Sequence, residues 1–523
     1  MIRKILILLS SCSSRGRAKV TVLKLMKKVL IVGGGTAGVT IADRLAPYAD
    51  VVVLERSKYR QYPLLFRIPL LGGLLFQSGK YVRKVLLQSG VRGALPFFES
   101  NVLGGASAIN GCVHAVGSLQ RWQTVFAETA FGEEGVMRAY QACYSASGKK
   151  GSLSLKEASQ DKLDRQFLQT LDQAGVPVGD MSFSDRPKCG AILINTGRWV
   201  RSSVVSAFFH RRRYHVEMGG DVNRLVLNQT GDCIGVYVEG RLMKADYVIV
   251  AGGVIGTTAL LSKTQNYMQK SGAQMFNLSS LGTGIKDHPN LRIKVLCRAG
   301  YKTLNEISHS LFLKAVEFSK HLVGYPSLMR TPGATSAAYL DLDEDGVVDT
   351  KIQLVHFTEK GRLGSDDPKQ LFDSRPGFSL AITLLNPKSS GKIDSQGRVD
   401  PGYFAEKEDL NLMKCGLNYA LNLLQSEPLS SVVEAVIDQQ EIETDAEQYV
   451  LNHFFSGYHL IGGVSVGKEG KLLDQKLKMR GVEGLYVCDA SVFESHVSSN
   501  THAPVVLLAD QFARSFVKDE LQG

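Results

Sequence analysis

Short apolar runs alternate with amphipathic helical patterns along much of the chain. The first run, residues 29–32, is continuously apolar and rich in β-branched residues, which is typical of a strand buried on both faces of a parallel sheet. Residues 39–46 follow with helical spacing, and a second apolar run occupies residues 51–54. This succession predicts a β-α-β unit, and therefore an α/β protein with a parallel sheet.

Later segments extend this pattern. Residues 246–250 and 485–487 are further short apolar runs, which we expect to be buried strands. Residues 378–385 have a strand pattern, whereas residues 410–424 and 505–516 have helical spacing. The chain therefore combines a parallel-sheet region with a region of mixed strands and helices.

The turn after the first strand has the G-x-G-x-x-G spacing of a dinucleotide-binding loop. Gly33 permits the tight turn, Gly35 lets a pyrophosphate approach the backbone, and Gly38 lets helix and strand pack closely. Glu55 ends the second strand, where it would accept hydrogen bonds from ribose hydroxyls. These residues leave open whether the dinucleotide is FAD or NAD. The predicted phosphate-binding residues are Gly33, Gly35, Thr36, Ala37 and Gly38.

The net charge of +11 belongs mainly to one end of the chain. Residues 1–28 contain eight Lys or Arg and no Asp or Glu, so the rest of the chain is only +3. The remaining basic cluster, Arg211–Arg213, is typical of a solvated helix end. We therefore expect no nucleic-acid partner.

Residues 1–25 are expected to be a dispensable extension of a cytoplasmic protein. Their apolar run, residues 5–9, is short for an export signal, although residues 9–12 resemble a lipoprotein cleavage box that would place a lipid on Cys12. Export or lipid anchoring is therefore the alternative. The eight cysteines are scattered without a C-x-x-C pair, which indicates reduced thiols. No run of about 18 apolar residues exists, so we expect no integral membrane segment.

Three further stretches identify a family resemblance. They are the glycine-rich residues 101–111, the segment Tyr458–Gly463 and the tail from Gly481 to Pro504. Together with the N-terminal fingerprint they resemble the glucose–methanol–choline (GMC) oxidoreductases, which bind FAD. The resemblance extends over residues 26–516. Weaker matches are Gly284–Pro289 and Pro387–Gly391.

The resemblance implies a discontinuous, Rossmann-like FAD-binding domain and a second, α+β substrate-binding domain. We accordingly divide the chain into four parts. An extension covers residues 1–25, the FAD-binding domain covers 26–292, the substrate-binding domain covers 293–450, and residues 451–523 return to the FAD-binding domain. The substrate pocket is expected between the two domains.

The resemblance also implies further cofactor contacts. Residues 103–111 are small, as a backbone that passes close to a flat ring must be. Asp489 follows the strand 485–487, at the edge of the sheet where such folds bind ligands. Ile109 stands where some members have a histidine bonded to the flavin, so we expect non-covalent FAD. The expected contacts in these later segments are Gly104, Gly105, Asn110, Gly111, Val222, Asp489, Ala490, His502 and Pro504.

His459 and Asn500 match the family's catalytic pair. Oxidation of an alcohol removes a proton from oxygen and a hydride from carbon, and an imidazole is a suitable base near neutral pH. By resemblance, Asn500 would hold the alcohol oxygen and orient the C–H bond toward flavin N5. We expect a small alcohol substrate and either O₂ or another electron acceptor. His288, His453 and His496 are expected to be structural.

Two other functions remain open for the same fold. A redox-neutral lyase, similar to the hydroxynitrile lyases of this family, would keep the flavin without using it. A non-catalytic flavoprotein would need no base beside the flavin, so the His459 and Asn500 pair argues against it. Fold resemblance alone does not name the substrate.

No metal site is expected. Residues 341–349 have the opening spacing of a calcium loop, but Ile352 stands where the bidentate acid should be. This segment predicts an acidic hairpin turn before a strand at residues 351–356.

Overall fold

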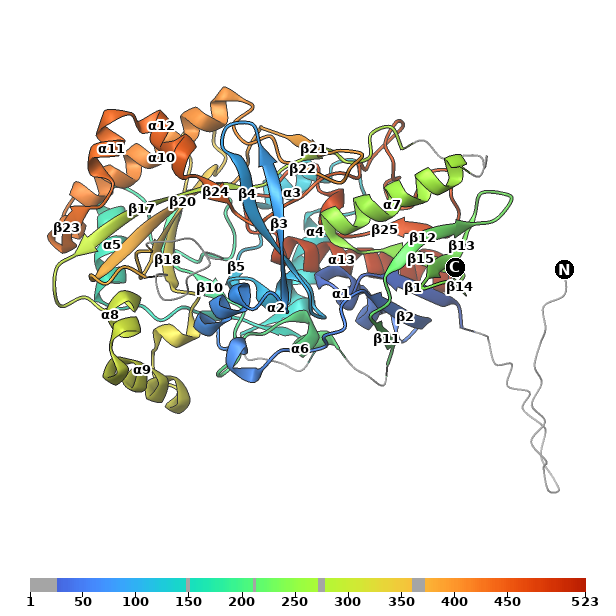
Figure 1. Ribbon diagram of the computed structural model, residues 1–523, viewed down its shortest axis with the longest axis horizontal. Coiled ribbons are helices and arrows are strands. Elements are labelled where there is room, and N and C mark those ends of the chain that lie inside the picture. Colours follow the sequence, from blue (N-terminus) through green and yellow to red (C-terminus); the bar gives the residue numbers. More distant parts are fainter. Residues whose placement is uncertain (1–25, 147–150, 210–212, 271–277, 360–371) are drawn as a thin grey trace, which may run out of the picture.

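The computed structural model describes residues 26–146, 151–209, 213–270, 278–359 and 372–523. Five parallel strands form its central sheet, in the order β11-β2-β1-β15-β25 (Figure 1). The sheet confirms the Rossmann-like fold, and the β-α-β unit appears where the apolar pattern predicts it. The strands are β1 (Lys28–Val32), β2 (Asp50–Glu55), β11 (His215–Met218), β15 (Tyr247–Val250) and β25 (Leu485–Val487).

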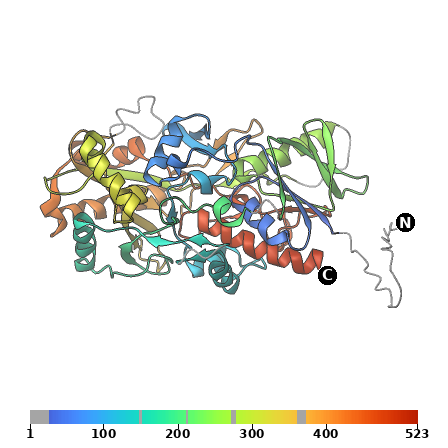
Figure 2. The same cartoon turned by 90° about the horizontal axis from the view of Figure 1, so that it is seen from below.

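Two helices cover the middle of this sheet. Helix α1 (Thr36–Leu45) packs against α13 (His502–Phe516), so that the first and last helices of the domain lie side by side (Figure 2). Helix α13 begins at His502, three residues earlier than its helical spacing indicates. Pro504 therefore lies within the first turn, where its missing N–H would have had no partner in the helix.

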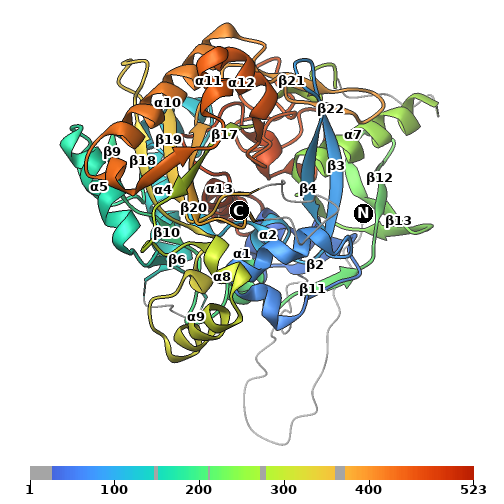
Figure 3. The ribbon, with the colours of Figure 1, turned by 60° about the vertical axis from the view of Figure 1, so that its left-hand side comes forward.

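A second, antiparallel sheet forms the other half of the molecule (Figure 3). Its order is β23-β17-β20-β19-β18-β9, and β24 also pairs with β17. Helix α10 (Lys407–Gln425) packs on the face that carries Ile352 and Leu354. The strands are β9 (Lys188–Ala191), β17 (Pro289–Cys297), β18 (Ala334–Leu340), β19 (Thr350–Val355), β20 (Gly377–Leu384), β23 (Val433–Val436) and β24 (Phe455–Ser456).

This sheet confirms the second, mixed domain. Strands β9 and β24 belong to this sheet although they lie outside residues 293–450. The chain therefore passes between the two halves more often than the predicted domain division implies. The boundaries themselves stay a prediction.

Residues 61–100 contain a hairpin that the sequence pattern did not predict. Strands β3 (Val82–Ser89) and β4 (Gly93–Ser100) pair antiparallel within a third sheet, β16-β21-β22-β3-β4. Most side chains of β3 are exposed or only partly buried, so its sequence lacks the alternation of apolar and polar residues that is typical of strands. The other strands of this sheet are β16 (Thr283–Ile285), β21 (Gly391–Ile393) and β22 (Val399–Asp400).

The remaining elements are helices and short strands outside these three sheets. None of the helices in the described ranges is long and apolar enough to cross a membrane. The helices are α2 (Ala106–Ile109), α3 (Leu119–Val125), α4 (Glu133–Cys143), α5 (Lys162–Gln173), α6 (Val204–Phe208), α7 (Gly253–Lys270), α8 (Leu304–His309), α9 (Leu311–Val323), α11 (Gln439–Thr444) and α12 (Ala446–His453). The short strands are β5 (Val113–His114), β6 (Tyr144–Ser145), β7 (Leu153–Ser154), β8 (Lys156–Glu157), β10 (Leu193–Ile194), β12 (Val222–Leu227), β13 (Cys233–Val238) and β14 (Arg241–Lys244).

The acidic segment 341–349 is the turn between β18 and β19, as predicted. Asp349 Oδ2 accepts hydrogen bonds from the backbone N–H groups of Leu342 and Asp343 at 2.8 and 3.1 Å. The carboxylates of this segment thus close a hairpin turn. Cys12 and most of the Arg211–Arg213 cluster lie outside the described residues.

Candidate active site

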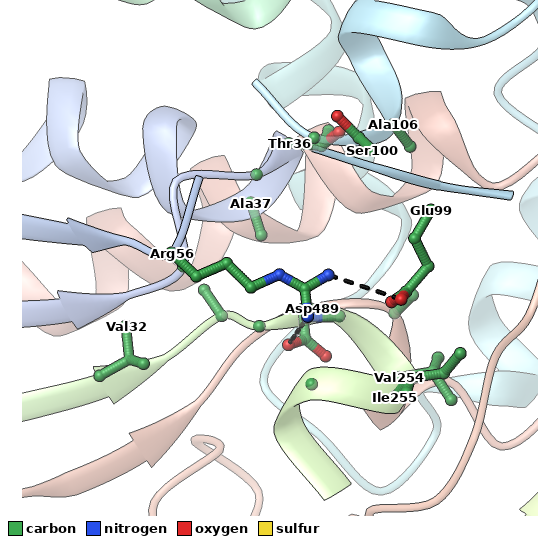
Figure 4. A pocket seen from close by; sticks show the side chains of 18 of the residues that line it. Val32, Thr36, Ala37, Arg56, Glu99, Ser100, Ala106, Val254, Ile255 and Asp489 are labelled. Atoms are coloured by element: carbon green, nitrogen blue, oxygen red, sulfur yellow. Dashed lines mark hydrogen bonds and ion pairs between the residues drawn. The ribbon is translucent and has the colours of Figure 1, made fainter. Parts of the chain in front are cut away.

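A cleft of about 320 Å³ opens along the carboxyl ends of the central strands. Parallel sheets of this kind bind ligands at that edge. Helix α1 and the segment of Asp489 meet there (Figure 4). Ten residues predicted to bind the cofactor line this cleft: Gly33, Gly35, Thr36, Ala37, Glu55, Gly105, Val222, Asp489, Ala490 and His502.

Three helix N-termini open on the cleft. Helices α1, α7 and α13 begin at residues that line it, and none has an acidic residue in its first turn. Their dipoles favour a bound anion such as a pyrophosphate, and the N–H groups at the starts of α1 and α13 can donate to it, whereas the N–H of Gly253 in α7 already donates to Asp489. Thr36 Oγ1 and His502 Nδ1 are buried at the same cleft and have no hydrogen-bond partner among the described residues. A polar ligand would satisfy both atoms.

Gly35 leaves room for a ligand rather than for the protein. A Cβ added there would meet only Gly105 Cα, at 3.9 Å, so the space beside it belongs to the cleft. Gly38 is different, because an added Cβ would come within 1.9 Å of the carbonyl oxygen of Gly33. Gly35 thus leaves space for the cofactor, and Gly38 allows the helix to pack against the strand.

Two carboxylates shape the cleft by binding backbone amides. Glu55 accepts from the N–H groups of Gly34 and Ser57 at 2.9 and 2.7 Å, and its burial raises the pKa of the carboxyl. Asp489 Oδ2 accepts from the Gly253 N–H at 2.8 Å, which ties β25 to the start of α7. Each oxygen of Glu55 keeps a lone pair for a ribose hydroxyl.

Five predicted cofactor residues do not line the cleft. Asn110 Oδ1 instead accepts from Arg201 Nη1 at 2.6 Å, and Pro504 lines a separate small cavity beside His496. Gly104 and Gly111 belong to the glycine-rich segment but do not line the cleft. The five residues are Gly38, Gly104, Asn110, Gly111 and Pro504.

Several residues that line the cleft were not predicted. Arg56 follows Glu55 and forms an ion pair with Glu99 at 3.5 Å (Figure 4). Its position at the carboxyl end of a central strand is a signal that sequence reasoning could have used. Phe97 and Phe98 come from the unpredicted strand β4, so no local pattern pointed to them.

The structure brings the predicted catalytic pair together. His459 Nε2 lies 3.2 Å from Asn500 Nδ2. Neither residue lines the cleft, but their chain neighbours Tyr458, Leu460 and Thr501 do. The pair therefore lies next to the cofactor cleft.

Hydrogen bonds determine which nitrogen of His459 carries the proton. His288 Nε2 lies 3.0 Å from the carbonyl oxygen of Leu385, which only accepts, so this nitrogen carries the hydrogen. In the neutral ring His288 Nδ1 is then an acceptor, and it lies 3.0 Å from His459 Nδ1. His459 therefore donates from Nδ1, and its Nε2 lone pair points toward Asn500.

The amide of Asn500 is oriented in a matching way. The Lys351 ammonium, which only donates, lies 2.9 Å from Asn500 Oδ1. The amide nitrogen of Asn500 therefore faces His459 Nε2. Lys351 and His288 were both missed as site residues, because strand β19 and the Asp287–Pro289 turn reach His459 only through the tertiary fold.

Burial keeps His459 neutral. It lowers the pKa of the His459 imidazole well below its usual value, and the charges of Lys351 and His496 lower it further. Asp287 accepts from the His459 backbone N–H at 2.7 Å, and burial raises the pKa of this carboxyl to about 6. Tyr458 has a φ of +61°, in the left-handed region, so the loop that presents the imidazole is held in a strained conformation.

The fold and these motifs recur in known proteins. Residues 27–290 and 386–509 match the N- and C-terminal models described as GMC oxidoreductase. The chain belongs to the GMC oxidoreductase family. This confirms the resemblance seen in the sequence, together with FAD as the cofactor of the family and of its structural neighbours.

GMC relatives match nearly the whole chain at low identity. An oxygen-dependent choline dehydrogenase from Vibrio vulnificus is 24% identical, over 92% of this chain and 93% of the relative. An alcohol dehydrogenase [acceptor] from Pseudomonas putida is 24% identical, over 94% and 96%. The structure of a formate oxidase superposes with a TM-score of 0.83 at 18% identity, over 94% of this chain and 98% of the other. The chain is accordingly an oxidoreductase of a family that acts on alcohols and related CH–OH donors.

The two glycines give a matched pair of substitutions. Gly35→Ala should weaken FAD binding by at least about fivefold, because overpacking a filled site costs roughly 1–3 kcal/mol. It should leave thermal unfolding of the apoprotein unchanged, since the added methyl group meets no protein atom closer than 3.9 Å. Gly38→Ala should lower the unfolding temperature of the apoprotein itself. FAD titration and calorimetry of both variants check this, and equal effects of the two on apoprotein stability would contradict it.

Proposed function

We propose that this GMC protein oxidises an alcohol to a carbonyl compound with His459 as the general base. The single observation that carries the proposal is the unprotonated His459 Nε2, which faces the Asn500 amide at 3.2 Å beside the cofactor cleft. A base and a hydrogen-bond donor that converge on one point are what removal of a hydroxyl proton requires.

An alcohol hydroxyl that replaces the direct contact between the two groups would bind to both. Its proton is donated to His459 Nε2, while its oxygen accepts from Asn500 Nδ2. As the proton moves to the base, the amide N–H stabilises the negative charge that develops on oxygen. When bound, FAD would be the oxidant that accepts the hydride from the carbon that carries the hydroxyl. Leu385 and His288 keep the ring in the tautomer that accepts this proton.

We also propose that FAD is held without a covalent bond. Ile109, at the tethering position, has an alkyl side chain that cannot form such a bond, and the cleft offers polar partners instead. The electron acceptor stays open between O₂ and another oxidant, because the names of the relatives include both kinds. Nothing in the comparisons favours the lyase alternative.

Anaerobic mixing with a panel of alcohols tests the proposed function. Bleaching of the flavin absorbance by at least one alcohol is expected, and readmitted air or an artificial acceptor should restore the colour. A lyase would turn over its substrate without bleaching, and that result would contradict the proposal.

Removing the base should slow flavin reduction without loss of FAD. His459→Ala is expected to lower the anaerobic reduction rate by roughly 10²–10⁴, the usual contribution of a positioned base. Asn500→Ala should slow the same step, and the double variant should lose less than the product of the two factors, since both groups act on one oxygen. The control is His453→Ala, which removes a partly exposed histidine that contacts Glu441. Reduction at the wild-type rate in His459→Ala would refute the assignment.

His288 should act through the tautomer of His459. His288→Ala removes the acceptor for His459 Nδ1, so we expect reduction to slow by roughly 10–100-fold, less than loss of the base itself. In the wild type the rate should stay constant down to a pH well below 6.5, because the pKa of His459 is lowered and only the imidazolium is inactive. In His288→Ala, the pH at which the reduction rate begins to fall on the acid side should differ from that of the wild type. Stopped-flow reduction between pH 5 and 9 measures this, and an unchanged rate and profile would exclude the role.

A further inference from the structure

Lys351 contacts the predicted catalytic pair through Asn500 and does not line the cofactor cleft. It belongs to β19, opposite Tyr339 of β18 and Thr383 of β20. The neighbouring Ile352 and Leu354 face α10, so Lys351 projects from the other face of the sheet. Its Nζ donates to Asn500 Oδ1 at 2.9 Å.

The ammonium of Lys351 is buried without a counter-ion. The residue is only 5% exposed, and no Asp or Glu of the described ranges forms an ion pair with it. Of its three N–H donors, the described structure gives a hydrogen bond to one, the bond to Asn500. Burial lowers the pKa of Lys351 to about 8, so the side chain carries its positive charge in most molecules at neutral pH.

An unpaired buried cation is costly, and proteins normally pair it. By contrast, Lys294 and Arg292 of β17, two strands away in the same sheet, each have a carboxylate, Asp438 and Glu359 respectively. Lys351 alone of these three has none, and it is the one that contacts the catalytic pair. The missing negative charge is therefore expected from a ligand.

We propose that Lys351 binds a carboxylate of the substrate, and hence that the protein oxidises a hydroxy acid. This inference rests on the proposed alcohol oxidation, which it makes more specific. Lys351 holds the oxygen of the same amide whose nitrogen meets the hydroxyl, so the carboxylate and the carbinol carbon must be close neighbours in one molecule. A 2-hydroxy acid has this arrangement.

The reaction is balanced with FAD as the oxidant. The hydroxyl O–H bond breaks and its proton goes to His459 Nε2. The C–H bond on the same carbon breaks and its electron pair leaves with the hydrogen as hydride to FAD. A C=O bond forms, the carboxylate stays unchanged, and the product is a 2-oxo acid.

The same charge argues against a cationic alcohol. Several relatives are named for choline, which carries a quaternary ammonium group. In this chain such a group would lie against the Lys351 ammonium, and the repulsion between the two positive charges would oppose its binding. Choline is thus a natural negative control.

Anion binding can be measured without turnover. Acetate is the probe, titrated into the FAD-loaded protein by calorimetry and by its perturbation of the flavin spectrum. Lys351→Met, which keeps the length of the side chain and removes its charge, should lose at least about tenfold in acetate affinity. Lys351→Arg keeps the positive charge and should retain most of the acetate affinity. Lys286→Met is the matched control, because this half-buried lysine donates to the carbonyls of Pro387 and Lys388 and should not affect acetate binding.

The outcomes separate the two proposals. Glycolate or lactate should reduce the wild-type flavin with a lower half-saturating concentration than ethylene glycol or choline, and Lys351→Met should abolish that preference. Equal acetate affinity in wild type and Lys351→Met would overturn the anion site, even if neutral alcohols bleach the flavin. If acetate binding depends on Lys351 but no alcohol or hydroxy acid bleaches the flavin, the anion site stands and alcohol oxidation fails.

Discussion

The chain of hydrogen bonds from Leu385 through His288 to His459 is the constraint on which the proposed chemistry depends. A backbone carbonyl cannot change its role as an acceptor, so it determines the proton positions of both imidazoles. The nitrogen that we propose as the base, His459 Nε2, is thereby left unprotonated. Burial keeps the pKa of both histidines low, so the arrangement stays neutral and stable around neutral pH.

The two halves of the molecule contribute different parts of the site. The parallel sheet supplies the cleft, with three helix N-termini that suit the negative charge of a pyrophosphate. The antiparallel sheet supplies Lys351 and, at the start of β17, the turn that carries His288. His459 and Asn500 lie where these parts meet. In our proposal, recognition of the substrate depends mainly on the second sheet, and binding of the cofactor on the first.

Much of the cofactor cleft could be predicted because its residues follow one another in local motifs. Gly33, Gly35, Thr36, Ala37 and Glu55 lie within one β-α-β unit, so their spacing placed them. Asp489 follows a short apolar strand, and the family resemblance added its contact with the cofactor. Lys351 could not be found in this way. A lysine in an alternating strand normally faces solvent, and only the pairing of β19 with β18 and β20 turns it toward Asn500. His288 was noticed in its motif, but its contact with His459 spans 171 residues of sequence.

The protonation of His459 is the central claim, and ¹⁵N NMR of the imidazole nitrogens tests it most directly. FAD-loaded protein labelled with ¹⁵N-histidine would be measured at pH 7, with the signals of His459 assigned from the His459→Gln variant. We expect a neutral ring with hydrogen on Nδ1 and none on Nε2. A ring protonated on both nitrogens, or on Nε2 alone, would contradict the account, because no lone pair would then face Asn500 and the substrate hydroxyl.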